Sequence, residues 1–495
     1  ELTYGNYDFM RGATSVTGPI SEQLAFRVDG VYVKRNGFYR DDQNGHDVNN
    51  RDRYFLRGQL LFEPTDALSV RLIADYTSRK EECCAATYVD GTVNQFIGNL
   101  NTPSAVGAAS TATSNNIINV LRDLGQPLAA FNQGYGRNIS VSANRVFTGE
   151  TKDYGFSGQI DYDFGGATLT SITAYRQYRS GQASDTDYGE VDILYRAPSD
   201  DAYRQFHTFT QELRLQGEAL DGKLDWLVGG FFANEKLTVR DNLRFGNQYG
   251  RFANCRIISG GGLAFAYNPT AQSCITPSLR PTVSGALGAA GPLIVSAFDR
   301  LDTMNNVGTT NDRYFQNGTN WALFTHNTLN LSDKLSLTVG VRYTNEKKTL
   351  DASFTDNNVM CRALSALPTA HPLYGTGQLA CIIPSIPNGS YAQDNAVIKE
   401  NKFTGTAVLS YKPSDDVLTY ASFSRGYKAG GFNLDRNSLY RLGRSSVSNG
   451  NRAIDGSVIN TQALGFDPET VDAYEVGFKY DGRGFDVNVA GFYQK

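Results

Sequence analysis

The chain has 495 residues, of which 40% are hydrophobic, and it is rich in Tyr (28), Phe (28) and Gly (50) but poor in Met (3) and Cys (6). It contains no apolar run long enough for a transmembrane helix, so the helical class of membrane protein is excluded. The formal net charge is −4, which gives no indication of nucleic-acid binding.

Segments with alternating apolar and polar side chains recur along the whole chain. In the segment 335–344, Leu337, Val339 and Val341 fall on one face and Arg342 falls on the other. A period of two predicts a β-strand whose faces meet two different environments. The predicted strands, in chain order, are 7–17, 24–34, 52–62, 68–77, 154–164, 168–179, 208–216, 224–235, 321–330, 335–344, 402–411, 418–425, 471–480 and 485–495.

Tight turns and long connections separate these strands in a regular order. The short turns are predicted at 18–21, 63–66, 165–166, 332–334, 412–416 and 481–484. The connections at 78–152, 236–320 and 346–401 each exceed fifty residues. Short turns at one rim and long loops at the other are typical of a bacterial outer-membrane barrel. We therefore expect an all-β fold, a transmembrane antiparallel β-barrel.

The number of strands indicates that the barrel is incomplete. Residues 1–4 are interpreted as the end of an earlier strand, which raises the expected number to fifteen. Whole bacterial barrels close with an even number of strands. The sequence also stops inside a predicted strand and shows no signal peptide. We therefore expect residues 1–495 to be a partial barrel that is cut at both ends.

The long loops have two interpretations. They carry Gly, Ser, Asn and Pro, and stretches of this length in compact proteins usually bind something or are disordered. A functional interpretation makes them a lid over the barrel mouth, and the plainer alternative makes them solvated surface tethers. We favour the lid.

Two phrases near the C-terminus resemble a known family. Residues 423–433 (FSRGYKAGGFN) closely resemble a signature of TonB-dependent outer-membrane receptors, and 466–469 with 474–479 (FDPE and YEVGFK) are similar to the element that follows it in that family. Recurrent barrel phrases of the family are also matched at 211–215, 229–232 and 340–343. The likeness covers essentially the whole chain, with the phrases in the right order.

The resemblance implies a fold and a function. Family members have a 22-stranded barrel closed by an N-terminal plug, so the resemblance implies that the plug, the TonB-contacting box and about seven strands are missing from this sequence. It also implies a receptor in the outer membrane of a Gram-negative bacterium, which takes up a scarce bulky nutrient with the TonB energy-transducing complex. Ferric siderophores are the commonest cargo, and cobalamin, oligosaccharides and aromatic compounds are carried by relatives. The alternative is a passive channel or a surface-binding barrel.

The signature itself has a functional and an architectural interpretation. Arg425 is expected to face the lumen at the end of its strand, followed by Tyr427 and Lys428 at the mouth. An aromatic and basic mixture suits a bulky anionic cargo, held by stacking and charge-assisted hydrogen bonds. The architectural alternative, which we favour, is that the motif only shapes the exit from strand to loop.

Charged residues share the polar face of several predicted strands. They are Arg27, Asp29, Arg53, Arg57, Arg71, Asp75, Asp153, Asp161, Asp163, Glu212, Arg214 and Arg342. A lumen wall of mixed sign could hold a plug through ion pairs, or it could guide an anionic ligand. The mixture of signs favours plug docking.

The cysteines indicate an oxidising compartment. Cys255 with Cys274, and Cys361 with Cys381, each enclose a short segment of one long loop, and we expect both pairs to form disulfides. For the neighbouring Cys83 and Cys84, a vicinal disulfide, a metal site and two free thiols all remain open, although a metal site is disfavoured by the scarcity of His.

Catalytic chemistry finds little support. A protease or lipase would need a His paired with Ser or Asp near the loop tips. His326 is predicted to face inward in mid-strand and His207 to face outward. We therefore expect neither enzymatic activity nor a cofactor or metal.

Overall fold

The computed structural model describes residues 1–86, 117–127, 136–197, 202–368, 370–383, 385–386, 389–435 and 461–495. These residues form one antiparallel sheet of fifteen strands, in which each strand pairs with the next one along the sheet in chain order. The strands are β1 (Leu2–Gly5), β2 (Phe9–Ser21), β3 (Leu24–Arg35), β6 (Arg51–Thr65), β7 (Leu68–Glu82), β9 (Thr148–Asp163), β10 (Ala167–Gln182), β13 (Tyr203–Ala219), β14 (Leu224–Asp241), β16 (Asp312–Ser332), β17 (Leu335–Thr355), β18 (Ser390–Ser414), β19 (Val417–Lys428), β22 (Glu469–Asp481) and β23 (Asp486–Gln494).

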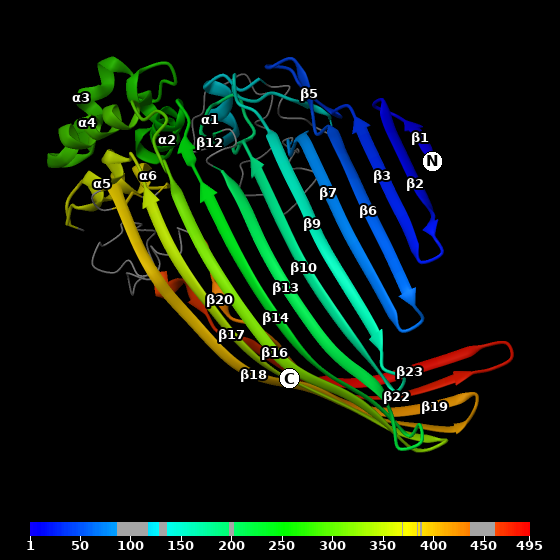
Figure 1. The fold of residues 1–495 in the computed structure, drawn as a ribbon. Helices are drawn as coiled ribbons and strands as arrows, with labels where there is room; N and C mark the ends of the chain where they lie inside the picture. Colours follow the sequence, from blue (N-terminus) through cyan, green and yellow to red (C-terminus); the bar gives the residue numbers. More distant parts are fainter. Residues whose placement is uncertain are drawn as a thin grey trace.

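The sheet is a strongly curved, open wall. Figure 1 shows the six tight turns that the sequence predicted together at one rim and the helices together at the opposite end of the strands. β1 and β23 are the two edges of the sheet. The expected all-β antiparallel barrel wall of fifteen strands, with its turns on one rim, is therefore confirmed.

The register assigns every strand residue to one of two faces. Directly paired residues point the same way, as Tyr343 of β17 and Phe403 of β18 do. Rows of this kind define an outer face with apolar and aromatic side chains, to which Leu337 and Val341 belong. The opposite, inner face carries the charged residues, including Arg342. The two faces along this strand are those that the sequence predicted.

Several strands are longer than the alternation predicted, and the character of their inner face changes along their length. In β17 the inner side chains are polar near the turn, but Leu350, Ala352 and Phe354 at the other end are buried. They pack against Ile386 and Phe432 from the loops. The alternation therefore reverses above the expected membrane band, which is why the sequence placed the end of this strand too early.

The loops fold into a compact cap at the end of the wall away from the turns. The cap contains α1 (Ile117–Asp123), α2 (Tyr249–Ile258), α3 (Arg280–Ala286), α4 (Gly291–Leu301), α5 (Val359–Ser365) and α6 (Tyr374–Ala380), together with the short strands β11 (Ser184–Asp185), β12 (Leu194–Arg196) and β15 (Leu243–Phe245). Other short strands at this end are β4 (Tyr39–Asp41), β5 (His46–Val48), β8 (Asn138–Ile139), β20 (Gly431–Phe432) and β21 (Gly465–Phe466), and the 3-10 helices are η5 (Gly261–Ala266), η6 (Gln272–Cys274), η7 (Pro277–Leu279), η8 (Gly288–Ala290) and η11 (Thr461–Leu464). Each helix in the described part of the chain is too short or too polar to cross a membrane.

One hydrophobic core joins several loops of the cap. Leu121, Ile193, Phe245, Leu301 and Cys361, which come from four different connections between sheet strands, belong to it. A tether would leave such side chains in water, so the described loops are folded structure. Residues 87–116 and 128–135 of the first long loop lie outside the described residues.

Candidate ligand-binding site

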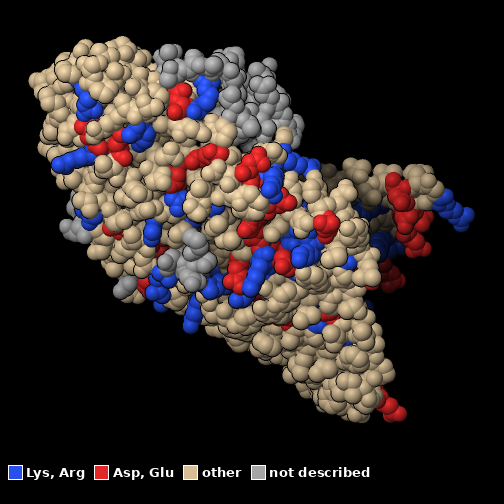
Figure 2. Space-filling view, turned by 90° about the horizontal axis from the view of Figure 1, so that it is seen from above, with Lys and Arg blue, Asp and Glu red and all other residues tan. Residues whose placement is uncertain are grey.

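The inner face of the wall carries the charged residues that the sequence placed there. Its register includes Arg27, Asp29, Arg53, Arg57, Arg71, Asp75, Asp153, Asp161, Asp163, Glu212, Arg214 and Arg342. Figure 2, seen from above, shows acidic and basic side chains mixed, without a large patch of one sign. The wall therefore offers a polar surface of both charges to whatever occupies the lumen.

Most of these charges are neutralised within the wall. The Arg53 guanidinium donates to the Glu81 carboxylate at 2.6 and 2.7 Å. Arg176 bridges two carboxylates, Asp75 at 2.8 Å and Asp153 at 2.7 Å. Ion pairs between adjacent strands, and across β9 in the case of Arg176 and Asp75, satisfy these groups.

Two of these wall residues escaped the sequence analysis for different reasons. Glu81 lies beyond the predicted end of its strand at residue 77. Arg176 lies inside a predicted strand, and its period-two position was the available signal. Its partners could not be assigned, because the register between strands is not visible in one strand alone.

The remaining arginines of the wall differ in their surroundings. Arg27 pairs with Asp29 on its own strand at 2.9 Å, and Arg71 donates to Gln59 Oε1 at 2.7 Å. The Arg57 Nε atom is buried and has no hydrogen-bond partner among the described residues.

Arg342 uses aromatic partners instead of a carboxylate. Its guanidinium lies 5.4 Å from the ring centroid of Phe231 and 5.5 Å from that of Phe324. All three side chains share the inner face. This contact holds the cation by its attraction to the ring faces.

A polar cluster lies on the inner face, closer to the cap. Lys348 Nζ pairs with Glu346 at 2.8 Å and donates to the Gly430 carbonyl oxygen at 2.6 Å. Glu400 accepts a hydrogen bond from the Gly430 N–H at 3.0 Å, while its second carboxylate oxygen has no partner among the described residues. Both backbone groups of Gly430, its N–H and its carbonyl oxygen, are thus hydrogen-bonded to side chains of the cluster. The two glutamates and the lysine could not be recognised from the alternation, because they lie in a predicted loop.

Two of the three signature glycines, Gly430 and Gly431, leave no room for a side chain. A Cβ atom at Gly430 would lie 2.4 Å from Glu400 Oε1 and 2.5 Å from the carbonyl oxygen of Phe466. One at Gly431 would lie 2.9 Å from the ring of Phe466. Phe432 is buried in the hydrophobic core under the loops. In the pairing of β20 with β21, Gly431 lies opposite Phe466 and Phe432 lies opposite Gly465. The two family-like phrases therefore pack on each other, which supports the architectural interpretation.

The expectation that Arg425 faces the lumen is wrong. Arg425 pairs in register with Gly405, which lies in the same row as the outer-face residue Val341. Its guanidinium donates to the Asp472 carboxylate at 2.6 Å, also on the outer face. The alternation in β19 was assigned to the wrong side, because both faces of this strand carry small polar and apolar residues.

The other two signature residues are neighbours in β19 and alternate in register. Tyr427 has the parity of Arg425, but it lies beyond the last β18–β19 pair and its hydroxyl reaches the inner-face cluster. Tyr427 donates its hydroxyl proton to Glu346 Oε2 at 3.3 Å. Lys428 falls on the inner face by register and is exposed. No ion pair or side-chain hydrogen bond of Lys428 is found within the described ranges. It is therefore a free cation at the mouth.

A seam opens where β18 and β19 separate. Their pairing ends at Gly405 and Arg425. Beyond this point the Gln462 side chain accepts from the Val397 N–H and donates to the Val397 carbonyl oxygen, as a neighbouring strand would. A cavity of about 450 Å³ lies at this seam, and Lys402 is among the residues that line it. The seam thus adds a second lysine close to the polar cluster.

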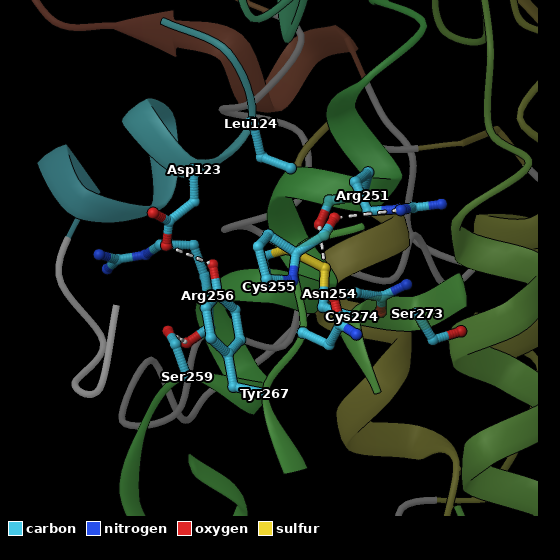
Figure 3. The surroundings of a disulfide bond; sticks show 12 residues. Asp123, Leu124, Arg251, Asn254, Cys255, Arg256, Ser259, Tyr267, Ser273 and Cys274 are labelled. Atoms are coloured by element: carbon cyan, nitrogen blue, oxygen red, sulfur yellow. Dashed lines mark hydrogen bonds between the residues drawn. A yellow bond between two sulfur atoms is a disulfide. The ribbon is translucent and has the colours of Figure 1, made fainter. Parts of the chain in front are cut away.

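The cap is reinforced by disulfides. Cys255 bonds Cys274 with a Cα–Cα distance of 5.1 Å, and Cys361 bonds Cys381 with 5.0 Å. Figure 3 shows the first of these beside α1. There the Tyr267 hydroxyl donates to Asp123 at 2.9 Å, which joins two loops. Burial raises the pKa of Tyr267 far above its ordinary value.

Cys83 and Cys84 are also joined by a disulfide. Of the three alternatives that the sequence left open, the structure contains this one. In the described part of the chain, no group of three or more His, Cys, Asp or Glu side chains could hold a metal ion.

Two aspartates of the cap have strongly perturbed acidities. Asp185 accepts from the Tyr188 N–H at 2.9 Å, and Asp187 accepts from the N–H groups of Leu194 at 2.6 Å and Ile193 at 3.0 Å. Burial raises the pKa of Asp185 to about 8 and that of Asp187 to about 7. Each carboxylate organises the turn around it.

Known proteins that resemble this chain fall into one family and include several solved structures of similar fold. The model of a family described as TonB dependent receptor-like, beta-barrel, matches residues 97–495. No curated protein matches the sequence.

Solved structures with a similar fold include three receptors. The ferric yersiniabactin uptake receptor FyuA from Yersinia pestis has a TM-score of 0.59 at 13% identity, over 99% of this chain and 52% of that chain. The ferric-catecholate import receptor Fiu from E. coli K12 has a TM-score of 0.56 at 12% identity, over 99% and 57%. The siderophore receptor PiuA from Acinetobacter baumannii has a TM-score of 0.52 at 12% identity, over 99% and 56%. The chain thus spans little more than half the length of these structures, and identities this low compare the fold alone.

Proposed function

The chain belongs to the family of TonB-dependent receptor-like β-barrels, and we propose that it forms the wall and cap of an active transporter for a scarce, bulky nutrient. The family consists of transport receptors of the Gram-negative outer membrane and not of enzymes. In this proposal, the apolar outer face contacts lipid and the cap receives the nutrient. TonB and the proton gradient then drive passage through the lumen, with the plug expected from the family.

The observation that carries the proposal is the folded cap. Side chains from four connections share one core at the end of the wall, and disulfides close two of the loops. A passive channel needs an open mouth, whereas a receptor needs a shaped surface that binds its cargo before passage.

We propose a ferric siderophore as the cargo. The inner mouth offers Lys428, Lys402 and the ring of Tyr427, which suit an anionic chelate with aromatic groups. The names of the three similar structures support this cargo class. Arg425 has no part in the proposal, because it faces outward.

Energy dependence tests the transport mechanism. Cells that carry the full-length protein should bind the cargo without energy, and they should import it only when TonB and the inner-membrane potential are intact. Uptake that persists in a strain without TonB would establish a passive pore instead.

Growth tests identify the cargo. A deletion strain should fail to grow with certain ferric siderophores as the sole iron source, and the intact gene should restore that growth. Normal growth on all iron sources, combined with a defect on one oligosaccharide or aromatic carbon source, would replace the siderophore by that compound while retaining the receptor.

A further inference from the structure

A second cavity lies within the cap, between two loops. Its volume is about 490 Å³, which is within the range of about 300–1,000 Å³ that small-molecule sites occupy. From α4, Leu293, Ser296, Ala297 and Arg300 line it, and the three- and four-residue spacing places them on one helix face. None of its lining residues belongs to the inner-wall cluster or to the signature.

The facing side of the cavity comes from the other loop. Val359, Met360, Ala363 and Leu364 of α5 line it, again on one face of a helix. α4 follows the Cys255–Cys274 disulfide in the same connection between β14 and β16, and α5 contains Cys361. The cavity is therefore a cleft between two loops that each contain one disulfide, here called the α4–α5 cleft.

α4 has apolar side chains on the face that packs into the hydrophobic cores and also on the face that lines the cleft. Val295 and Phe298 point into one hydrophobic core and Leu301 into another. Leu293 and Val359, at the cleft, remain 45% and 68% exposed. The cleft therefore keeps apolar surface that folding has left uncovered, and such surface is characteristic of binding sites.

The cleft contains two of the three methionines of the chain. Met304 is buried and Met360 is half-buried in its wall. Methionine is flexible and polarisable, so it adapts to guests of different shape. This composition favours a molecule with an apolar body.

Most polar groups of the cleft are already used. Asn358 accepts from the Cys361 N–H and donates to the carbonyls of Ala380 and Ile383, and Thr303 donates to the Arg300 carbonyl oxygen. The Arg300 guanidinium and the Ser296 hydroxyl lie one helical turn apart and have no side-chain partner within the described ranges. These two donors are left to meet a ligand.

The charge of Arg300 is not neutralised by its own helix. Asp299 pairs with Arg280 at 2.6 Å, and Asp302 pairs with Arg251 at 3.0 Å. Arg300 lies in the last turn of α4, where a cation stabilises the helix end. That effect acts on the backbone and leaves the guanidinium itself unpaired.

We propose that the α4–α5 cleft binds a small amphipathic carboxylate, with its apolar body between the two helices and its carboxylate on Arg300 and Ser296. An arginine binds a carboxylate through two parallel hydrogen bonds, and the apolar wall excludes a fully hydrated ion. This site goes beyond the proposed transport function, since it lies in the cap and uses neither the lumen nor TonB.

Fluorine NMR of the full chain in detergent micelles tests the site with 4′-fluorobiphenyl-4-carboxylate. The matched neutral probe is the corresponding primary alcohol. We expect saturable broadening of the carboxylate signal, with a Kd of about 10 µM–1 mM for a ligand of this size. Arg300→Gln should weaken the carboxylate by about tenfold and leave the alcohol unchanged.

Two further variants separate this site from binding elsewhere. Ala363 is exposed at the cleft, so Ala363→Trp should fill it and abolish binding of both probes without disturbing a core. The control Arg313→Gln removes an exposed arginine of β16 that does not line the cleft, and it should have no effect. Binding that survives Ala363→Trp, or that loses nothing in Arg300→Gln, would overturn the proposal.

Discussion

At the scale of single residues, Gly430 shows why the family-like signature has its sequence. Its N–H is bound by Glu400 and its carbonyl oxygen by Lys348, so the chain leaves β19 along a fixed path. The absence of a side chain allows this, because Glu400 and the backbone of Phe466 occupy the position of a Cβ atom. The close approach of Gly430 to Phe466 joins the signature to the segment before β22.

Gly430→Ala should destabilise this junction by about 1–3 kcal/mol, since the new methyl group must displace backbone atoms. The control is Gly426→Ala, whose Cβ would meet only a Val471 side-chain atom at 3.5 Å. Urea denaturation in micelles, with hydrogen exchange of residues 461–469, measures the difference. Equal stability of the two variants would contradict the close approach.

Lys428 and Arg425 should respond differently to truncation. Lys428→Ala should weaken binding of an anionic cargo by a factor of about three to ten, because it removes an exposed cation on the inner face. Arg425→Ala should leave the affinity unchanged, because its partner is Asp472 on the outer face. Titration of both variants with the cargo found by the growth test measures this. A larger loss in Arg425→Ala would reinstate that residue in the site.

The wrong prediction for Arg425 shows that alternation alone does not establish which face of a strand points into the lumen. Alternation separates a strand into two faces, but in β19 neither face is clearly apolar, with Ala421 and Phe423 opposite Tyr420 and Ser422. The register with β18 decides the side, and register depends on pairing between strands. For Arg342 in β17 the choice was correct, because its own strand has one clearly apolar face.

At the scale of elements, the strands were predictable in the part that crosses between two environments. Leu335 to Tyr343 alternate because one side meets an apolar phase and the other a polar lumen. Above that part, Leu350 and Phe354 are covered by loops, and the pattern reverses. If the inner face is assumed to be polar along its whole length, the predicted strand ends too early.

The helices of the cap were not predicted. They contain only 7–11 residues each, such as the seven of α5 and the eleven of α4. Isolated helices of this length are marginal in water, so tertiary packing determines them. The sequence contains that information only as contacts between loops, such as the core shared by Leu121 and Cys361.

The stability of the cap should fall as pH rises from about 5 to 8. An exposed aspartate has a pKa near 3.9, whereas burial raises the pKa of Asp185 to about 8 and that of Asp187 to about 7 in the folded cap. Between these values the folded state holds more protons than the unfolded state, so unfolding becomes easier with increasing pH.

Hydrogen exchange, corrected for intrinsic rates, measures this effect. Protection of residues 183–197 should fall by at least about tenfold between pH 6 and pH 8, because one unit of pKa corresponds to a factor of ten. The strand segment 337–344, which has no carboxylate, is the control. Protection in 183–197 that is constant or rises would show that burial does not hold these protons.

At the scale of the whole molecule, the disulfides should stabilise the cap and not the wall. Replacing Cys255 and Cys274 by Ser should destabilise the cap by about 3 kcal/mol, as expected for a bridge across 19 residues. The same loss is expected for Cys361 and Cys381, which are 20 residues apart. Limited proteolysis of the cap and hydrogen exchange of the strands distinguish the two regions.

The matched control removes Cys83 and Cys84. This bridge joins neighbouring residues and closes almost no loop, so its replacement by Ser should cost little chain entropy. Strands that lose protection in the Cys255 and Cys274 variant would show that wall and cap unfold together.

The architecture as a whole could be predicted because one signal repeats. Fifteen strands with turns on a single rim follow from alternation and loop length, each repeated along the chain. The candidate site depends on single contacts between distant segments, such as Lys348 with Gly430. No repeated sequence pattern indicates these contacts. The fold was therefore visible in the sequence, while the polar cluster was not.

The length of β17 determines where a nutrient first meets the molecule. Its 21 residues extend about 70 Å, and only the part up to Tyr343, about 30 Å, has an apolar outer face. With a tilt of about 40°, the remainder raises the cap about 30 Å beyond the lipid boundary. Electrostatic forces between exposed charges fade over about 8 Å in physiological salt. An anionic nutrient would thus reach the cap in open water, where negative charge on the lipid surface no longer repels it.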